Sequence, residues 1–294
     1  MSASESVWLP ATDLRPWVDF HIQCSTPDTT GRLTTHLPPS ATASLTLILK
    51  GGVSLLEAAT YQPRALPRVF FSGARTQPAK LISEGSFSCL VVVFTPGRWH
   101  SLVDASPISL LNRHLDVSSL GMGWLIQLAG RLAAAPVQQQ QALLEQTLRH
   151  WLLQAPGQAS SESFSPLDTR WMRDTLLHKP PGQMSRDYGL SLRQIERRFT
   201  RQFGLTPKAY QRLARHALLL AHLGQAAEAG DLAGLASKLG YADQAHLSRD
   251  LKHFTGMQPG KMLHLALQNP GYWAYRVLPR ALAEGAGMSR FFKP

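Results

Sequence analysis

A repeated pattern in the last third of the chain most constrains its fold. The segment IERRFTRQFGLTP at 195–207 aligns with LSRDLKHFTGMQP at 247–259 at a constant spacing of 52 residues, with a matched arginine, a matched glycine and a matched final proline. A further glycine precedes each segment, Gly189 in the first copy and Gly240 in the second. Each copy therefore predicts a short helix, a turn at the glycine, a second helix and a Gly-x-x-Pro exit, which is the layout of a helix-turn-helix.

The residues around each turn predict where its second helix begins. Glycine adopts a left-handed backbone without steric cost, so Gly189 and Gly240 suit the end of the preceding helix. Ser191 with Gln194 three residues later has the pattern of a capping box, and Asp243 is the expected N-cap in the other copy. The second helices are therefore expected to begin directly after Ser191 and Asp243.

A long helix is expected to join the two copies. The segment PKAYQRLARHALLLAHLG places Leu213, Ala217, Leu220 and Leu223 at helical spacing. A helix of roughly 17 residues would be about 25 Å long. Two recognition helices held by such a connection would be placed to enter successive major grooves of DNA, which lie about 34 Å apart.

This half of the chain resembles the DNA-binding domain of the AraC/XylS family of bacterial transcription regulators. The resemblance covers about residues 165–265 and rests on RDYGLSLRQIERRFTRQFGLTPKAYQRLARHALLLAHL in the first copy and LAGLASKLGYADQAHLSRDLKHFTGMQPGKML in the second. It implies two helix-turn-helix units, at about 183–204 and 231–255, that bind double-stranded DNA. RNA polymerase and a homodimer partner are also implied by the resemblance.

Positions that contact DNA in that family can be matched one by one to this sequence. Arginine and glutamine can form bidentate hydrogen bonds with guanine and adenine. For any single arginine the alternative is a solvated surface charge, an alternative that is weakest for Arg197 and Arg249 because the repeat aligns them. Glu196 either accepts a hydrogen bond from cytosine or pairs within its own helix. The implied base-facing residues are Arg193, Glu196, Arg197, Gln244, Ala245, Ser248 and Arg249, with Gln194 near the DNA backbone. The expected phosphate contacts are Arg198, Arg201 and Lys252.

Positive charge is concentrated in the same half of the chain. Residues 164–294 hold 19 of the 30 Lys and Arg residues but only 9 of the 19 Asp and Glu residues, so nearly all of the net charge of +11 lies there. Clustered cations of this kind favour a nucleic acid or an anionic membrane as partner. The small and polar residues of APGQASSESFSP predict a linker just before this region. The expected organisation is a β-rich sensor or dimerisation domain at 1–155, a linker at 156–165, the DNA-binding domain at 166–268 and a tail at 269–294.

The first 155 residues predict strands followed by two helices. SLTLILKGG places Leu45, Leu47 and Leu49 on one face, and FSCLVVVF has the character of a buried strand. Pro136 separates two helical segments, and the second carries an apolar stripe that either covers its own β domain, the commoner outcome, or forms a dimer interface. The stripe consists of Leu144, Leu148, Trp151 and Leu152. The expected fold class is therefore two-domain α+β, with a cupin-like barrel or sandwich and two helices followed by an all-α double helix-turn-helix domain.

The β-rich domain weakly resembles the sensor domain that precedes this DNA-binding domain in one subgroup of the family. That resemblance implies binding of a small-molecule effector, or dimerisation. Arg98, Trp99 and His100 follow a Pro-Gly turn and are the candidate lining of a ligand pocket. The alternative, which we favour, is that they form a turn packed on the core.

Patterns for catalysis and metal binding are missing from the sequence. The histidines do not form the close His-x-His and Glu set of a metal-binding cupin, and no phosphate loop or Ser/His/Asp arrangement is evident. We therefore expect a regulator that is not an enzyme and that needs neither a cofactor nor a metal. The alternative is a DNA-targeted enzyme or adaptive-response repair factor, which would need a reactive cysteine. Cys89 lies in an apolar strand and is better suited to a buried thiol.

The expected location of the protein is the cytoplasm. The N-terminus lacks the basic and apolar layout of a signal peptide, and no apolar run approaches the roughly 18 residues that a transmembrane helix needs. The two cysteines, Cys24 and Cys89, are too few for a disulfide framework. No membrane is therefore expected as a partner.

Overall fold

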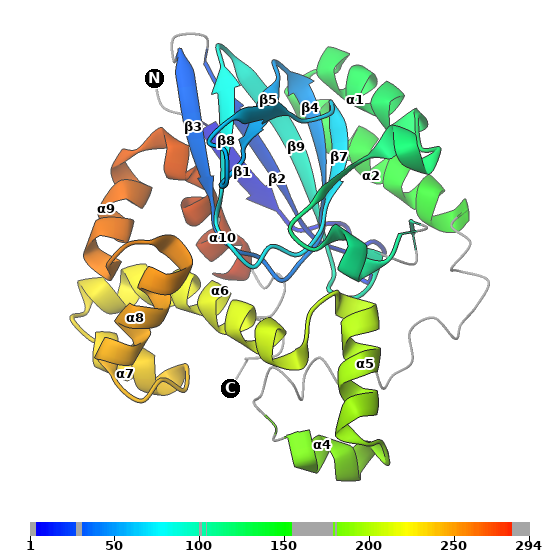
Figure 1. Ribbon diagram of the computed structural model, residues 1–294. Helices are drawn as coiled ribbons and strands as arrows, with labels where there is room; N and C mark the ends of the chain where they lie inside the picture. The colour runs from blue at the N-terminus through cyan, green and yellow to red at the C-terminus, as the bar shows by residue number, and fades with distance from the viewer. Residues whose placement is uncertain are drawn as a thin grey trace.

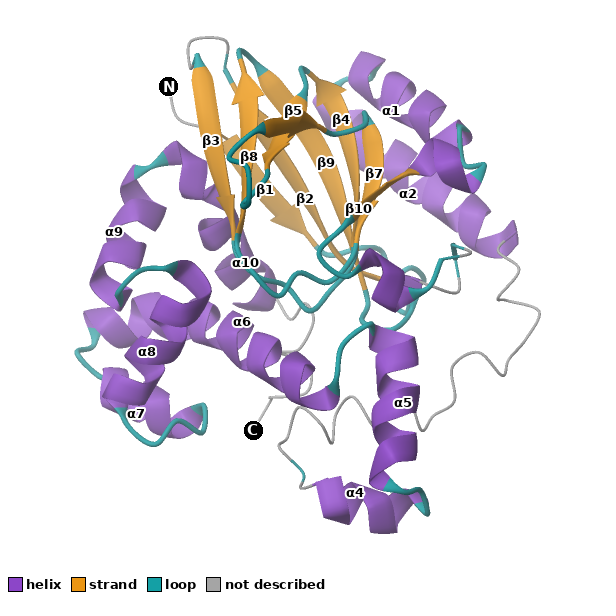
Figure 2. Cartoon of the chain, viewed as in Figure 1, coloured by secondary structure: helices purple, strands orange, loops and turns teal. Residues whose placement is uncertain are grey.

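The computed structural model describes residues 4–27, 31–99, 102–103, 105–154, 179 and 181–283. Strands fill the first part of the chain and helices the rest, as Figures 1 and 2 show, which confirms the expected fold class. The strands are β1 (Ser4–Trp8), β2 (Val18–Thr26), β3 (Arg32–Leu37), β4 (Ser44–Lys50), β5 (Val53–Leu56), β6 (Pro63–Ala65), β7 (Val69–Ser72), β8 (Ala79–Glu84), β9 (Phe87–Phe94) and β10 (His114–Asp116). The α-helices are α1 (Trp124–Ala134), α2 (Val137–Gln154), α4 (Pro181–Tyr188), α5 (Leu192–Phe203), α6 (Pro207–Glu228), α7 (Leu232–Lys238), α8 (Gln244–Thr255), α9 (Pro259–Gln268) and α10 (Trp273–Ala283). Short 3-10 helices are η3 (Pro107–Leu110), η4 (Val117–Leu120) and η6 (Pro270–Tyr272).

The larger sheet has six strands in the order β1-β2-β9-β4-β7-β10 and buries both of its faces. Alternate residues of a strand point to opposite faces. Leu45, Leu47 and Leu49 of β4 accordingly lie together in one core, as predicted, whereas Ile48 lies in the other. Because both faces are apolar, the sheet must be covered on both sides.

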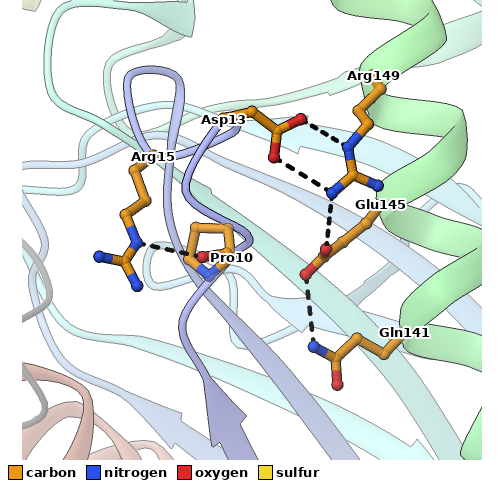
Figure 3. A network of polar contacts seen from close by, with 6 residues as sticks. All are labelled: Pro10, Asp13, Arg15, Gln141, Glu145 and Arg149. Carbon is orange, nitrogen blue, oxygen red and sulfur yellow. Dashed lines mark hydrogen bonds and ion pairs between the residues drawn. The ribbon is translucent and has the colours of Figure 1, made fainter.

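Helices α1 and α2 cover the first face, next to the sheet in Figure 1. All four residues of the stripe predicted on α2 are buried in this core, so the stripe covers its own β domain instead of being free for a partner. A polar clamp holds α2 from outside: the Arg149 guanidinium donates to Asp13 from Nε at 2.6 Å and from Nη2 at 3.2 Å (Figure 3). Arg149 also pairs with Glu145, which accepts from Gln141 in turn.

The second face is covered by a smaller sheet and by the last helix. The smaller sheet has the order β3-β8-β5-β6. Helix α10 adds Trp273, Ala274, Val277 and Ala281 to the core between the sheets. The final helix of the chain therefore completes the core of the first domain.

The other side of α10 belongs to the second helix-turn-helix. Tyr272, just before α10, and Tyr275 are buried with α6, α7, α8 and α9. Arg276 bridges the two regions, because its guanidinium pairs with Glu5 on β1 and also donates to the Ala266 carbonyl at 2.6 Å. Residues that follow the repeat thus join the two domains through packed contacts.

Two histidines are fully buried in the structure. His216 lies on α6 with its ring 4.6 Å from that of Phe254, and His21 lies on β2 with its ring 5.3 Å from that of Trp8. Neither imidazole has a hydrogen-bond partner among the described residues. Burial lowers the pKa of each to about 4, so both are neutral at pH 7. Among the described helices, none combines the length and the apolar character needed to span a bilayer.

Acid is expected to destabilise the protein through His216. In the unfolded chain the pKa of a histidine is about 6.5, so between that pH and about 4 the unfolded state binds more protons than the folded state. The stabilising effect of the neutral imidazole is complete above this window and is lost as the pH falls through it. Urea unfolding at pH 7 and pH 5 measures how much unfolding free energy the protein loses between the two pH values. This loss should be about 2 kcal/mol smaller for His216→Leu than for the unchanged protein. The same change at exposed His264 should leave the loss unaltered, and equal behaviour of the two variants would contradict the assignment.

The stripe on α2 gives a second prediction, for stability. Leu144 is completely buried, whereas Leu153 on the same helix is 72% exposed. Leu144→Ala should lower the free energy of unfolding by roughly 2–5 kcal/mol, because it leaves a cavity in the core. Leu153→Ala should change it by less than about 0.5 kcal/mol. Urea unfolding followed by tryptophan fluorescence measures both, and similar effects of the two changes would show that the stripe does not face the sheet.

Candidate nucleic-acid interface

The first helix-turn-helix consists of α4 and α5. Gly189 between them has a φ of +61°, the left-handed conformation expected of it. The predicted capping box is present: Ser191 Oγ accepts from the Gln194 amide at 3.3 Å, and Gln194 Oε1 accepts from the Ser191 amide at 2.8 Å. Ile195 and Phe199 are buried as predicted. These local contacts fix both the start of α5 and the side that it presents to solvent.

The exposed side of α5 carries every residue predicted there to contact DNA. These residues are Arg193, Gln194, Glu196, Arg197, Arg198 and Arg201. The Gln194 side chain is also engaged in the cap, which ties its carbonyl oxygen to the helix N-terminus. Leu192, which the sequence did not single out, is 52% exposed beside Arg193. The sequence could have indicated it only because Leu192 is apolar but does not share the i, i+4 spacing of the buried Ile195 and Phe199.

The second helix-turn-helix consists of α7 and α8. Gly240 has a φ of +74°, and Asp243 caps α8 by accepting from the His246 amide at 2.6 Å. Leu247 and Leu251 are buried at the positions that align with Ile195 and Phe199. The outward residues predicted to contact DNA are exposed, except that Ser248 is half-buried. They are Gln244, Ala245, Ser248, Arg249 and Lys252.

An acidic residue fixes α8 to the connecting helix. Asp250 accepts from Arg212 on α6 at 3.2 Å and from the Tyr241 hydroxyl at 2.8 Å. The guanidinium of Arg212 also lies 5.1 Å from the centre of the Phe254 ring. Asp250 aligns with exposed Arg198 in the first copy, so the two copies use this position differently. Sequence reasoning missed this contact, and its one signal was a carboxylate on a helix otherwise rich in cations.

The connecting helix α6 is longer than expected. It has 22 residues in place of roughly 17, which makes it about 33 Å long. Helix α5 stands at its N-terminal end, whereas α7 and α8 pack alongside it (Figure 1). The two recognition helices are therefore held apart by one continuous helix.

The first unit also rests on the β-rich domain. Gly204, which ends α5, lies so close to η3 that an added Cβ would be 2.6 Å from the Pro107 carbonyl oxygen. Gly97 similarly meets Phe203 of α5, since a Cβ there would be 2.8 Å from the ring. Gly256, the matching exit glycine of the second copy, has open space around it. The exit glycine of α5 is thus packed against the first domain, whereas the exit glycine of α8 is not.

The described residues of the turn at Arg98 and Trp99 contact other parts of the first domain, which is the alternative favoured from the sequence. Trp99 is buried in the core with Phe71. The Arg98 guanidinium lies 5.3 Å from the centre of the Trp17 ring, and His100 lies outside the described residues. Neither Arg98 nor Trp99 lines the cavity described next.

A cavity of about 160 Å³, here called the apolar cavity, lies between the two sheets. Both sheets contribute apolar side chains to it, among them Phe20, Phe70 and Leu81. Ala217 of α6 and Trp273 of α10 also line it. Helices that support the second recognition helix therefore form part of its wall. The sequence offered no local sign of this cavity, because its lining comes from segments far apart in the chain.

The cysteines and the possible metal ligands bear on the alternative of a DNA-targeted enzyme. Cys24 and Cys89 are both buried, and burial raises the pKa of the Cys89 thiol to about 12. Such a thiol is not a nucleophile at neutral pH. Within the described ranges, no group of three or more His, Cys, Asp or Glu side chains is placed to hold a metal ion.

Comparison with known proteins assigns the repeated region to a family. Residues 184–264 match the family model of a helix-turn-helix domain. No curated protein matches the chain. Among solved structures, the chain is similar to ToxT from Vibrio cholerae in a P21 crystal form, with 10% identity, a TM-score of 0.44 and coverage of 90% of this chain and 99% of that one. A ToxT structure with an unsaturated fatty acid bound shows 11% identity, a TM-score of 0.41 and coverage of 90% and 95%. The AraC-like transcriptional activator CuxR shows 15% identity, a TM-score of 0.29 and coverage of 93% and 91%.

The matched range contains both turns, both recognition helices and the helix that connects them. The sequence repeat, the two capped helices and the family match therefore agree on one module. The C-terminal part of the chain therefore contains a double helix-turn-helix domain, a module that binds DNA.

Proposed function

We propose that the protein reads two sites on double-stranded DNA, one with α5 and one with α8. The observation that carries this proposal is the pair Arg197 and Arg249, which the repeat aligns and which are both exposed on capped helices. Both recognition helices are fixed to the continuous helix α6, α5 at its N-terminal end and α8 along its side, so the spacing of the two arginines is set by the fold. The clustered cations of this half supply the affinity for phosphates that does not depend on sequence.

Individual residues have separate roles in this proposal. Arginine and glutamine side chains read base edges, while cations on the flanks position the helices on the phosphates. Exposed Leu192 is suited to contact a thymine methyl group. The base contacts are assigned to Arg193, Glu196, Arg197, Gln244, Ala245, Ser248 and Arg249. The backbone contacts are assigned to Gln194, Arg198, Arg201 and Lys252.

We further propose that a small apolar effector occupies the apolar cavity and modulates DNA binding. Support comes from the walls of the cavity, which combine both sheets with Ala217 of α6 and Trp273 of α10. A molecule bound there contacts elements that also form the core around α8. We assign the effector to this cavity and not to the turn at Arg98, Trp99 and His100, because Trp99 is engaged in the core.

Further partners rest on the resemblance alone. Regulators of the AraC/XylS type act on RNA polymerase, and we propose the same partner here. A homodimer is also proposed, although the stripe on α2 does not supply its interface because it is buried. Action in the cytoplasm follows from the proposed target, double-stranded DNA.

The matched arginines give a prediction for DNA binding. Arg197→Ala and Arg249→Ala should each reduce the difference in binding free energy between specific and scrambled duplexes by roughly 1–3 kcal/mol. Each should also relax the preference at one base pair. Lys252→Ala should weaken binding to all sequences alike. It should also lower the slope of the logarithm of the binding constant against the logarithm of the salt concentration by about 1. Arg131→Ala, at an exposed arginine on α1, is the matched control and should have no effect. Titration of specific and scrambled promoter duplexes at several salt concentrations measures these effects. Equal affinity of the unchanged protein for both duplexes would refute sequence-specific binding.

The apolar cavity gives a prediction for effector binding. Thr46 on the central strand β4 lines the cavity, so Thr46→Phe fills it whereas Thr46→Val keeps its volume. The neutral probe 1-octanol should bind the unchanged protein and Thr46→Val and should raise their melting temperatures, because a ligand of the folded state stabilises it. Thr46→Phe should lose both effects. Calorimetric titration tests this, and undiminished binding by Thr46→Phe would place the probe elsewhere.

A further inference from the structure

A second hollow adjoins the apolar cavity and has cationic side chains in its lining. It has a volume of about 350 Å³, and Arg75, Lys80 and Arg113 line it; we call it the anion pocket. Its one acidic lining residue, Glu57, is paired with Arg64 at 3.0 Å. Neither Lys80 nor Arg113 forms an ion pair with another residue in the described part of the chain. The pocket therefore has an excess of positive charge.

The apolar cavity and the anion pocket share one wall. Ser72, Gly73, Arg75 and His114 line both of them. The Ser72 hydroxyl and His114 Nδ1 are 2.8 Å apart, and Gly73 contributes no side chain. The two hollows thus adjoin along these four residues, and a molecule that occupies both must pass between their side chains.

The charge of Arg75 in this wall is not neutralised by the protein. Its Nε and Nη2 donate to the Pro38 carbonyl at 3.3 and 2.8 Å, and no carboxylate lies within ion-pair distance of it among the described residues. Burial lowers the pKa of Arg75 to about 10, and together with the charge of Arg75 it lowers the pKa of His114 to about 4. Arg75 is half-buried, and a partly desolvated cation without a counter-charge is unfavourable, so an anion at this wall would be stabilised.

Unusual backbone conformations mark the same pocket. Tyr61 and Asn112 have φ angles of 55° and 58°, and they are the only non-glycine residues with positive φ in the ranges that the structure describes. Both line the anion pocket. Asn112 is held there because its Oδ1 accepts from the Thr76 amide at 2.8 Å. Such conformations cost free energy and tend to occur at functional sites.

We propose that the effector is an amphiphile whose apolar chain lies in the apolar cavity and whose phosphate-bearing head group lies in the anion pocket. This inference rests on the proposed effector role of the apolar cavity and names the chemical class of its ligand. Three cations around a pocket of this size exceed what one carboxylate needs, whereas a phosphate accepts hydrogen bonds on several oxygens. The head group also neutralises Arg75, which the protein itself does not.

Calorimetric titration of the full-length protein tests the proposal with three probes: octyl phosphate, 1-octanol and inorganic phosphate. Octyl phosphate should bind at least about tenfold more tightly than 1-octanol, because it adds charge-assisted hydrogen bonds to the same apolar contact. Inorganic phosphate should bind far more weakly than octyl phosphate, because it lacks the chain. If the two phosphates bind equally well, the ligand is a free phosphate and the amphiphile proposal is wrong.

Substitutions at the pocket separate the head group from the chain. Lys80→Gln and Arg113→Gln should each lower the affinity for octyl phosphate by about tenfold and leave that for 1-octanol unchanged. Arg32→Gln, at an exposed arginine on β3 outside both hollows, is the matched control and should change neither. Equal affinity of the two octyl probes would overturn the head-group assignment while leaving the apolar cavity as the effector site. Failure of both octyl probes to bind would refute the effector proposal itself.

Discussion

The structure depends on a six-stranded sheet that is apolar on both faces. A sheet of this kind cannot leave either face in water, so the chain must supply two covers. Helices α1 and α2 form one cover from the segment that directly follows the strands. The other cover combines the smaller sheet with α10, which comes from the far end of the sequence. The need to bury the second face therefore brings the end of the chain back to its beginning.

This arrangement joins the β-rich domain and the double helix-turn-helix domain physically. Helix α10 buries one side in the core between the sheets and the other in the core around α8. The first recognition helix is tied to the same domain by a separate contact, where Gly204 approaches Pro107. Two recognition helices thus rest on one β-rich domain through different contacts. Packed elements of this kind can transmit a change at the cavity to the DNA-binding surface, provided that they have two stable arrangements.

The apolar cavity and the anion pocket follow from the same constraint. The smaller sheet has short strands, so it covers the second face of the larger sheet incompletely. Trp273 closes part of the remaining space, and Arg75 lies where the apolar cavity ends. Apolar walls with a few convergent polar groups are typical of small-molecule sites. The place of the hollows is therefore set by the space that the smaller sheet and α10 leave uncovered on the second face.

The exposed faces of the two helix-turn-helix units were largely predictable, whereas the apolar cavity was not. The hydrogen bonds of the helix caps at Ser191, Gln194 and Asp243 join residues only three positions apart in the chain. These caps could therefore be derived from spacing alone. Ile195 and Phe199 were placed by helical periodicity for the same reason. The Asp250 contact with Arg212 was missed because it joins residues 38 positions apart. For Arg98, Trp99 and His100 the turn signal left open a pocket lining or a turn packed on the core, because it cannot tell the two apart; Trp99 lies in the core of the first domain.

The sequence by itself determined the double helix-turn-helix, its inward and outward faces and the β-rich character of the first domain. These features rest on hydrogen bonds and side-chain periodicity between near neighbours in the chain. Only the tertiary structure decided that α10 completes the first domain, that α5 rests on η3 and that Arg75 lies between two hollows. Those contacts join residues far apart in the sequence, and they form because a sheet apolar on both faces must be covered by whatever apolar surface the chain can bring to it.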